Sequence, residues 1–472
     1  MKDLSATKRA AGVLPPKVSG YPLVGSLPGL AADPLSFVAE AQRKHGDIFT
    51  LDLGFTEALV VCHPKYAQHI LVDNARNYSK SGPMWDSLRT FMGNALPVSE
   101  GDFWLRQRRM IQPMFHQQRL AELTTKMVEA IDASMADWVQ VARKGQPFDI
   151  AHDLSRVTMS VLVRTMFGSG LELEEAERVA KSFTYILDYF VLGMATNPLP
   201  EWLPVPGRAR YREEIRNIDE VLQRIINRGR ANAEQEDNLL SLLLNMVDAE
   251  TGERMTDKQL RDEAVAFFVA GYETTAAGLC WVFHVLTRYP EIAARMLAEV
   301  DEVLGNRSPT FADLSRLDYC RRVLHESFRV YSPSIWLPRM SVEEDEMFGY
   351  QVPPGRMMVI FTYLLHRHPD VWKDPMTFDP DRFTPENSEG RHKLAWLPFG
   401  AGQRQCIGKG FSLMEAQLIM LRAVQRFLVS AVPGREPTPK FSTNLRTKDG
   451  VWVYLKERAA TSQQRESSDV AA

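Results

Sequence analysis

Cysteine is scarce in this 472-residue chain, which has only Cys62, Cys280, Cys320 and Cys406. They lie far apart and form no CxxC pair, which argues against a disulfide framework or a zinc ribbon and favours a reducing, cytoplasmic setting. A large charge of one sign is also missing. The formal net charge is −3, so nothing global points to nucleic acid or to an acidic lipid surface. No run of about 20 apolar residues predicts a membrane anchor, and the N-terminus has basic residues without an apolar signal core.

What is present is the composition of a folded protein with a large core, 45% hydrophobic and 24% charged. Apolar residues recur at three- and four-residue spacing through most of the chain, which predicts a mainly helical fold with a small β portion. We expect an extended, proline-containing lead-in over 1–30, one domain over 31–456, and a polar, disordered tail over 457–472. The helical patterns cover 117–143, 153–166, 174–193, 209–231, 257–289, 291–304, 318–330 and 409–428, and β-like runs lie at 48–54, 58–63, 357–362 and 451–455.

The stretch FGAGQRQCIG at 399–408 places one cysteine among three glycines, directly before a helical pattern. Glycines let the backbone turn tightly and approach something bulky. The start of a helix favours a thiolate, because free N–H groups and the positive end of the helix dipole lie there. A thiolate at Cys406 can attack an electrophile with a base from elsewhere, or it can bind a soft metal, which fits better. A buried structural cysteine is the third interpretation.

Phe399, Gly402, Arg404, Cys406 and Gly408 match the pattern FxxGxRxCxG, which resembles the haem-binding loop of the cytochromes P450. The resemblance implies that Cys406 is the axial ligand of the iron in haem b, iron protoporphyrin IX. It also implies the fold of that family, in which the haem lies between a long central helix and the helix after the cysteine loop.

The run AVAFFVAGYETTAAGLCWVFHVL at 264–286 is nearly apolar but contains a cluster of polar side chains. One explanation is a hydroxyl that bonds to the carbonyl four residues earlier. AGYETT also resembles the oxygen-binding stretch of the family. The resemblance implies that Ala270 and Gly271 adjoin the cofactor, that Thr274 hydrogen-bonds dioxygen or its water network, and that Glu273 relays protons.

HESFRVYSP at 325–333 places Glu326 and Arg329 at i and i+3, on one face of a helix. A surface pair is the ordinary explanation, but the apolar neighbours favour a buried pair that needs a further partner. The family has such a pair, completed by a downstream arginine, and FDPDRF at 378–383 resembles that piece. The resemblance therefore implies a structural trio with Arg382.

FWLRQRRMIQPMF at 103–115 contains Trp104 and Arg108 at i and i+4, like the pair that contacts a haem propionate in the family. A solvated basic helix face is the alternative. Arg339 is placed like the arginine of the second propionate, and Arg404 is a further candidate, because a guanidinium matches a carboxylate. The substrate pocket that the family pattern implies is lined by the helix near 186–194 and by Met84, Trp85, Leu88, Phe91, Ala270, Ser334, Ile335, Trp336 and Leu445.

Together these resemblances imply a haem-thiolate monooxygenase that hydroxylates or epoxidises a hydrophobic small molecule with O2. A terpenoid, a steroid, a fatty acid or a polyketide would suit an apolar pocket. Electrons are expected from a separate ferredoxin with its reductase or from a flavodoxin, attracted by Arg106, Arg109 and Lys409. Three alternatives stay open: a peroxide-driven or O2-independent haem-thiolate enzyme, a non-catalytic haem sensor, and a cysteine nucleophile without haem. A metal site at His366 and His368 is less favoured than a structural role for them.

Overall fold

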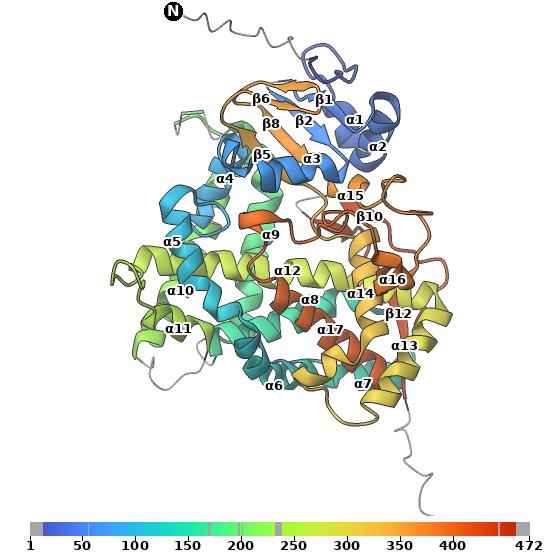
Figure 1. Ribbon diagram of the computed structural model, residues 1–472. Helices are drawn as coiled ribbons and strands as arrows, with labels where there is room; N and C mark the ends of the chain where they lie inside the picture. The colour runs from blue at the N-terminus through green and yellow to red at the C-terminus, as the bar shows by residue number, and fades with distance from the viewer. Residues whose placement is uncertain are drawn as a thin grey trace, which may run out of the picture. The chain divides into compact units, whose positions relative to one another are not determined.

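The computed structural model describes residues 13–54, 56–168, 171–196, 199–200, 202–231, 238–441 and 444–458 (Figure 1). Residues 1–12 of the predicted lead-in and 459–472 of the predicted tail lie outside the described residues. The fold is mainly helical with small β-sheets, which confirms the predicted fold class. The single domain over 31–456 stays a prediction.

Two compact units make up the chain. The sheet unit comprises the chain up to Gly82 together with Ser334–Met376 and Gly390–Cys406. Its helices are α1 (Leu27–Ala32), α2 (Pro34–His45), α3 (Pro64–Gln68), η1 (His69–Asp73), η2 (Ala75–Asn77), α15 (Thr362–Leu365) and η8 (Gly402–Arg404). Its strands are β1 (Ile48–Asp52), β2 (Glu57–Val61), β3 (Tyr78–Ser79), β5 (Leu337–Ser341), β6 (Asp345–Met347), β7 (Tyr350–Val352) and β8 (Met357–Ile360).

The helical unit comprises Pro83–Pro333, Thr377–Glu389 and the chain from Ile407. Its helices are α4 (Pro83–Met92), α5 (Gly101–Ile111), η3 (Gln112–Phe115), α6 (Gln117–Ser134), α7 (Ala136–Lys144), α8 (Ile150–Leu162), η4 (Val163–Phe167), α9 (Leu173–Thr196), α10 (Arg208–Ala231), α11 (Leu239–Asn245), α12 (Asp257–Arg288), α13 (Pro290–Val303), η6 (Phe311–Ser315), α14 (Asp318–Val330), η7 (Pro380–Phe383), α16 (Pro385–Ser388) and α17 (Lys409–Arg426). Its strands are β4 (Phe148–Asp149), β9 (Phe427–Ala431), β10 (Pro439–Phe441), β11 (Leu445–Thr447) and β12 (Trp452–Glu457).

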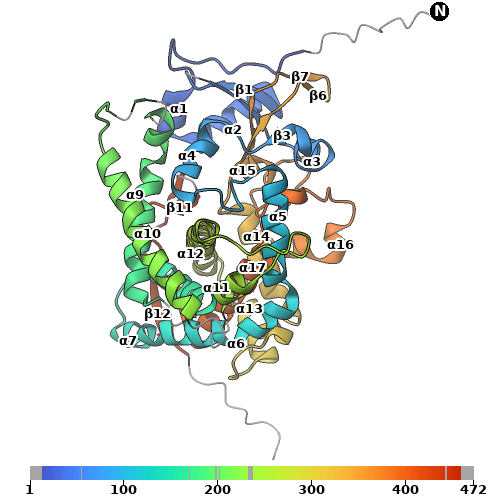
Figure 2. The same cartoon turned by 90° about the vertical axis from the view of Figure 1, so that its left-hand side faces the viewer.

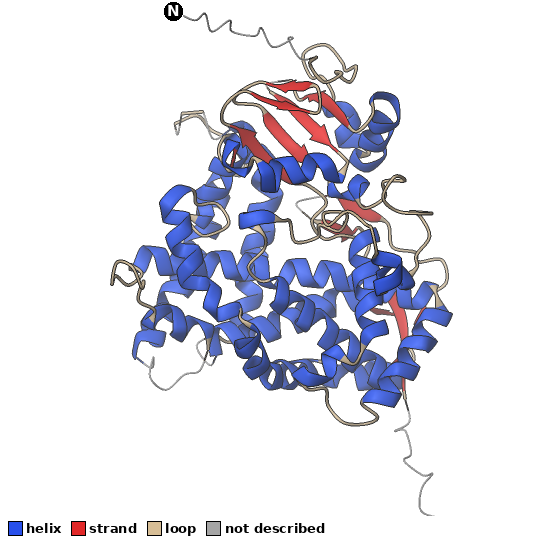
Figure 3. Ribbon diagram, in the orientation of Figure 1, coloured by secondary structure: helices blue, strands red, loops and turns tan. Residues whose placement is uncertain are grey.

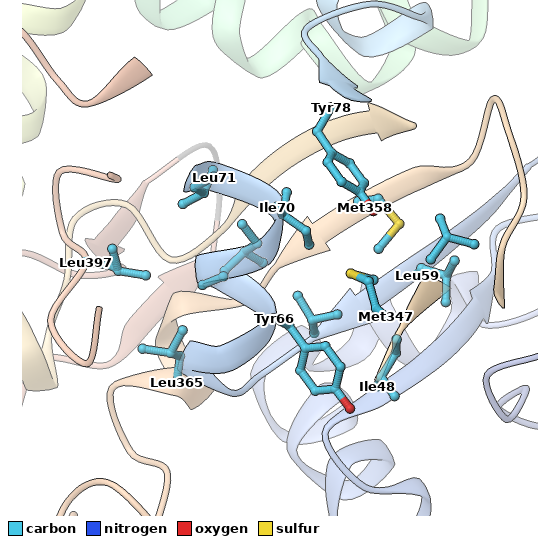
Figure 4. Packing of buried hydrophobic residues seen from close by; sticks show 14 of the residues in the cluster. Ile48, Leu59, Tyr66, Ile70, Leu71, Tyr78, Met347, Met358, Leu365 and Leu397 are labelled. Atoms are coloured by element: carbon cyan, nitrogen blue, oxygen red, sulfur yellow. The ribbon is translucent and has the colours of Figure 1, made fainter. Parts of the chain in front are cut away.

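The five-stranded sheet of the sheet unit has the order β1-β2-β8-β5-β3, with β2 and β8 parallel and the other neighbours antiparallel (Figure 3). Side chains alternate between its faces because a strand has a period of two. In β2, Leu59 and Val61 join one buried cluster and Ala58 and Val60 join another. Figure 4 shows the first cluster, to which Leu397 brings the segment before the cysteine loop. The sheet core thereby supports that loop.

The centre of the helical unit is α12, which Figure 2 shows nearly end-on with α10, α11 and α17 close to it. A capping box between Thr256 and Gln259 sets its start. The helix is long and apolar enough to cross a membrane, but 67% of its apolar window is buried inside the protein, as expected for a core helix. It is therefore the scaffold against which the other helices of this unit pack.

Most predicted helices lie within a few residues of the observed ones, but the predicted helix over 117–143 is two helices. Its pattern is interrupted at Met135, the C-cap of α6, which is fully buried like Trp138 of α7. No glycine or proline marks this position. Burial of these two large side chains, and not a local breaker, accompanies the break between α6 and α7. Helices α2, α4 and α5 were not among the predicted periodic ranges.

Candidate functional site

The four cysteines separate into one exposed thiol, Cys406, and three buried ones. Burial raises the pKa of Cys280 to about 12 and raises the pKa of Cys62 and Cys320 well above the usual value. These three side chains are therefore inert, since the thiolate is the reactive and metal-binding form. The accessibility of Cys406 contradicts the interpretation of it as a buried structural cysteine.

The cysteine loop is held by its own backbone and by the sheet core. The N–H of Cys406 donates to the carbonyl of Phe399 at 2.9 Å. Gly402 has φ +68, a conformation that favours glycine, and a Cβ there would lie 2.0 Å from the carbonyl oxygen of Leu71. Ala401 belongs to the buried cluster around the sheet. These contacts hold the loop that carries the accessible sulfur, directly before α17 in the chain.

A strip of small and polar side chains is accessible on the otherwise buried α12. Ala270 is exposed, and Gly271, Glu273 and Thr274 are half-buried. The hydroxyl of Thr274 donates to the carbonyl of Ala270 at 2.8 Å, which is the backbone bond expected as the non-catalytic explanation. The oxygen of that hydroxyl still has lone pairs that can accept a hydrogen bond from water. The bond therefore leaves the predicted role of Thr274 open.

Gly271 has a packing role in this structure. A Cβ at this position would lie 2.5 Å from Cδ1 of Leu162, so the glycine lets α8 and α12 approach closely. The predicted contact of Gly271 with the cofactor stays a prediction, because the contact with Leu162 describes only the side of the backbone toward which a Cβ would point.

Glu273 has an ionic partner that sequence reasoning missed, Arg446 of β11. Both side chains are largely buried, and burial lowers the pKa of Arg446. The same strand is tied to α12 by Leu445, whose carbonyl accepts from Nε1 of Trp281 at 3.1 Å. The N–H of Leu445 donates to the carbonyl of Pro333 at 2.9 Å. No local signal links position 446 to position 273, so only the fold could reveal this pair.

The structure brings Glu326, Arg329 and Arg382 together. Arg329 donates to both carboxylate oxygens of Glu326, at 2.6 and 2.7 Å, and both side chains are 0% exposed. Nε of Arg382 lies 3.4 Å from Glu326, and the N–H of Asp379 donates to the same carboxylate at 2.9 Å. Burial raises the pKa of Glu326, while the two arginines oppose that rise. This trio joins α14 to η7.

On α5, Trp104 is buried and Arg108 is half-buried, with Nε donating to Gln112 at 3.2 Å. The neighbouring basic side chains are engaged with a turn after α11. Arg109 donates to both oxygens of the fully buried carboxylate of Asp248, at 2.7 and 2.9 Å, and Nε of Arg106 lies 3.6 Å from the same group. Arg109 thus has a structural partner that the sequence did not indicate.

Two further arginines predicted to bind propionates lie in the sheet unit. Arg339 of β5 is 7% exposed and donates to the carbonyl of Pro338 at 2.7 Å. Arg404 ends η8 and is half-buried. A guanidinium in either place can pair with a carboxylate, but their roles stay predictions.

The predicted pocket residues fall into two groups. In the helical unit, Trp85 and Phe91 of α4 are buried and Met84 and Leu88 are half-buried, while Leu445 is fully buried and Ala270 of α12 is exposed. The sheet unit contains the other three, of which Ile335 is fully buried and Ser334 and Trp336 are half-buried.

The two histidines considered for a metal have structural partners. Nε2 of His366 accepts the N–H of Leu397 at 2.8 Å. Nε2 of His368 pairs with Asp47 at 2.8 Å, and its Nδ1 accepts the N–H of Asp370 at 3.2 Å. His368 therefore has no free lone pair, although His63, His368 and Asp370 have ligand atoms within 4.8 Å of one another.

These residues fit haem by their chemistry: an accessible sulfur in a glycine-lined loop, arginines for carboxylates, and a small-residue strip on a core helix. The sequence model described as "Cytochrome P450" matches residues 15–452. The chain is 36% identical over 414 residues to cyclooctat-9-en-7-ol 5-monooxygenase of Streptomyces melanosporofaciens, covering 88% of this chain and 89% of that protein. It is 32% identical to pentalenene oxygenase of Streptomyces avermitilis, covering 91% and 93%. The crystal structure of the cytochrome P450DA heme domain superposes with a TM-score of 0.86 at 28% identity, covering 96% of this chain and 99% of that one. The chain therefore belongs to the cytochrome P450 family and is a haem b monooxygenase.

Proposed function

We propose that this cytochrome P450 hydroxylates or epoxidises a terpenoid or a similar hydrophobic secondary metabolite, with Cys406 as the axial iron ligand. The observation that carries the proposal is the single accessible thiol in a glycine-lined loop of the pattern FxxGxRxCxG. The substrate class is supported by the names of two relatives, which give cyclooctat-9-en-7-ol and pentalenene as the compounds they oxidise.

Haem, when bound, supplies the reductive activation of O2 and the transfer of one oxygen atom. Arg108 with Trp104 would hold one of its carboxylates, and Arg339 with Arg404 would hold the other, through charge-assisted hydrogen bonds. These contacts would fix the orientation of the cofactor.

Proton supply is assigned to Glu273 and Thr274. The oxygen of the Thr274 hydroxyl can accept a hydrogen bond while the hydroxyl itself donates to the carbonyl of Ala270. The carboxylate of Glu273 forms an ion pair with Arg446, so it is expected to relay protons when it turns away from that partner. Thr274→Ala should therefore uncouple O2 consumption from product and release peroxide, whereas unchanged coupling would favour a peroxide-driven enzyme.

Electrons are proposed to come from a separate ferredoxin with its reductase or from a flavodoxin in the cytoplasm. Arg109 is a poor probe of such docking, because its charge neutralises the buried carboxylate of Asp248. Lys409→Glu is the cleaner variant. If Lys409→Glu is reduced more slowly than the unmodified protein, and the difference grows as the salt concentration is lowered, docking of the electron donor near Lys409 is supported.

The test of the proposed function is the reduced, carbon-monoxide-treated spectrum of the purified protein. We expect the far-shifted Soret band of thiolate ligation in the unmodified protein and in the buried-cysteine control Cys280→Ala, and its loss in Cys406→Ala. An unshifted band in the unmodified protein would refute the assignment. Titration with cyclic terpene alkenes and alcohols, compared with fatty acids, should then give a spin-state shift with the terpenes alone if the substrate class is correct.

A further inference from the structure

Glu263, near the start of α12, is a buried carboxyl with no part in the proposed chemistry. Its side chain is 0% exposed. Its two oxygens accept the N–H of Leu96 at 2.9 and 3.1 Å, and Oε1 also accepts Nε2 of Gln107 at 3.3 Å. One side chain of α12 is thus bonded both to the segment between α4 and α5 and to α5 itself.

The preceding residue, Asp262, holds the same segment. Its Oδ2 accepts the N–H of Asn94 at 2.9 Å and the ammonium of Lys258 at 2.7 Å. Gly93 has φ +60, and a Cβ there would lie 2.1 Å from Oδ1 of Asp262. Two consecutive acids therefore accept the N–H groups of positions 94 and 96, and the N–H of the buried Leu96 would otherwise have to lose its hydrogen bond in the protein interior.

Gln107 transmits this anchoring to α5. It is 1% exposed and lies between Trp104 and Arg108 in the sequence of that helix. Its Oε1 is buried and has no hydrogen-bond partner among the described residues. Burial, with a contribution from Asp262, raises the pKa of Glu263 to about 8. A protonated carboxyl can donate to that amide oxygen as well as accept, so the two side chains suit each other.

We propose that Glu263 is a positioning residue for the haem. Through Leu96 and Gln107 it fixes the position of α5 against α12. That helix carries Trp104 and Arg108, and the inference rests on the proposed function only in taking these two residues to hold a haem carboxylate.

The test follows transfer of haem from the holoenzyme to an excess of apomyoglobin, which reports cofactor retention without activity. Glu263→Met removes both acceptor oxygens at similar volume and should speed transfer about tenfold. Glu263→Gln keeps one acceptor oxygen for the N–H of Leu96 and gains an NH2 that can donate to Oε1 of Gln107, so transfer should stay within about threefold. The matched control is Glu299→Met. Glu299 accepts the N–H groups of Tyr319 and Cys320 at 2.7 and 2.8 Å, as Glu263 accepts that of Leu96, but it serves α14.

A double-mutant cycle identifies the route of the effect. If Glu263 acts through α5, then Glu263→Met combined with Arg108→Ala should speed transfer by clearly less than the product of the two single effects. The proposal is overturned if the double variant speeds haem transfer by the product of the two single effects. It is also overturned if Glu263→Met and Glu299→Met speed transfer equally, or if Glu263→Met transfers haem at the rate of the unmodified protein.

If Glu263→Met does not fold, Gln107→Met replaces it in the same cycle with the same expectations. The failure of the proposed function would appear elsewhere, as a missing thiolate Soret band in the unmodified protein. Haem transfer and band position therefore separate the two ideas.

Discussion

Removing one partner of the buried pair between Glu326 and Arg329 is expected to cost more stability than removing both. The two side chains are 0% exposed and joined by hydrogen bonds of 2.6 and 2.7 Å. Arg329→Met leaves a carboxylate in a low-dielectric interior, which costs about 3–5 kcal/mol. Arg382, 3.4 Å away, and the N–H of Asp379 still face that carboxylate, so the loss should lie toward the lower end of this range.

The double variant Glu326→Leu/Arg329→Met removes both charges. What remains is the N–H of Asp379, which donates to Glu326 at 2.9 Å and then loses that acceptor, and the guanidinium of Arg382, which loses the carboxylate 3.4 Å away but keeps its bond to the carbonyl of Thr377. An unsatisfied buried N–H costs about 1–3 kcal/mol. We therefore expect the double variant to be less destabilised than Arg329→Met alone, with a coupling energy of about 2 kcal/mol or more.

The assay is urea unfolding of the holoenzyme, followed by far-UV circular dichroism and by the Soret band, with midpoints compared at one pH. The control is the exposed pair of the same i,i+3 spacing, Asp86 with Arg89 at 2.9 Å, where Asp86→Ala should cost less than about 1 kcal/mol. Additive losses from the two buried substitutions would refute the reasoning, because they would mean that the two side chains contribute independently.

Two further predictions follow from single positions. Gly402→Ala should lower the urea midpoint and speed haem loss far more than Gly355→Ala, because the Cβ added at position 402 would lie 2.0 Å from the carbonyl oxygen of Leu71. Gly355 is the control, since its φ is almost the same, +67 against +68, but a Cβ there would have nothing within 4 Å. Equal effects of the two substitutions would mean that backbone strain, and not the contact with Leu71, is the cause. The pKa of Glu263, raised by burial to about 8, means that the folded state binds one more proton than the unfolded state between about pH 4.5 and 8. The free energy of unfolding should therefore fall as pH rises through that window, by at most about 1.4 kcal/mol per pH unit, and Glu263→Gln should remove this component. Parallel pH profiles of the unmodified protein and Glu263→Gln would contradict it.

Features that depend on neighbours in the chain could be predicted from the sequence. The period of the apolar residues predicted α12, α14 and α17, because the residues of one helix face recur at three- and four-residue spacing. The cysteine loop and the Glu326–Arg329 spacing are equally local, so the family resemblance could be stated before any coordinates. The comparisons confirm that the chain belongs to the cytochrome P450 family and that it is a haem monooxygenase.

Features that depend on which helices meet could not be predicted in this way. Glu273 with Arg446, Glu263 with Leu96, and Arg109 with Asp248 join residues far apart along the chain. Each is a buried polar group, and a buried polar group must find a partner wherever the packing places one. Sequence alone therefore determined the local elements and the ligand loop, whereas the tertiary structure decided which charges neutralise each other and which helices hold the loop between α4 and α5.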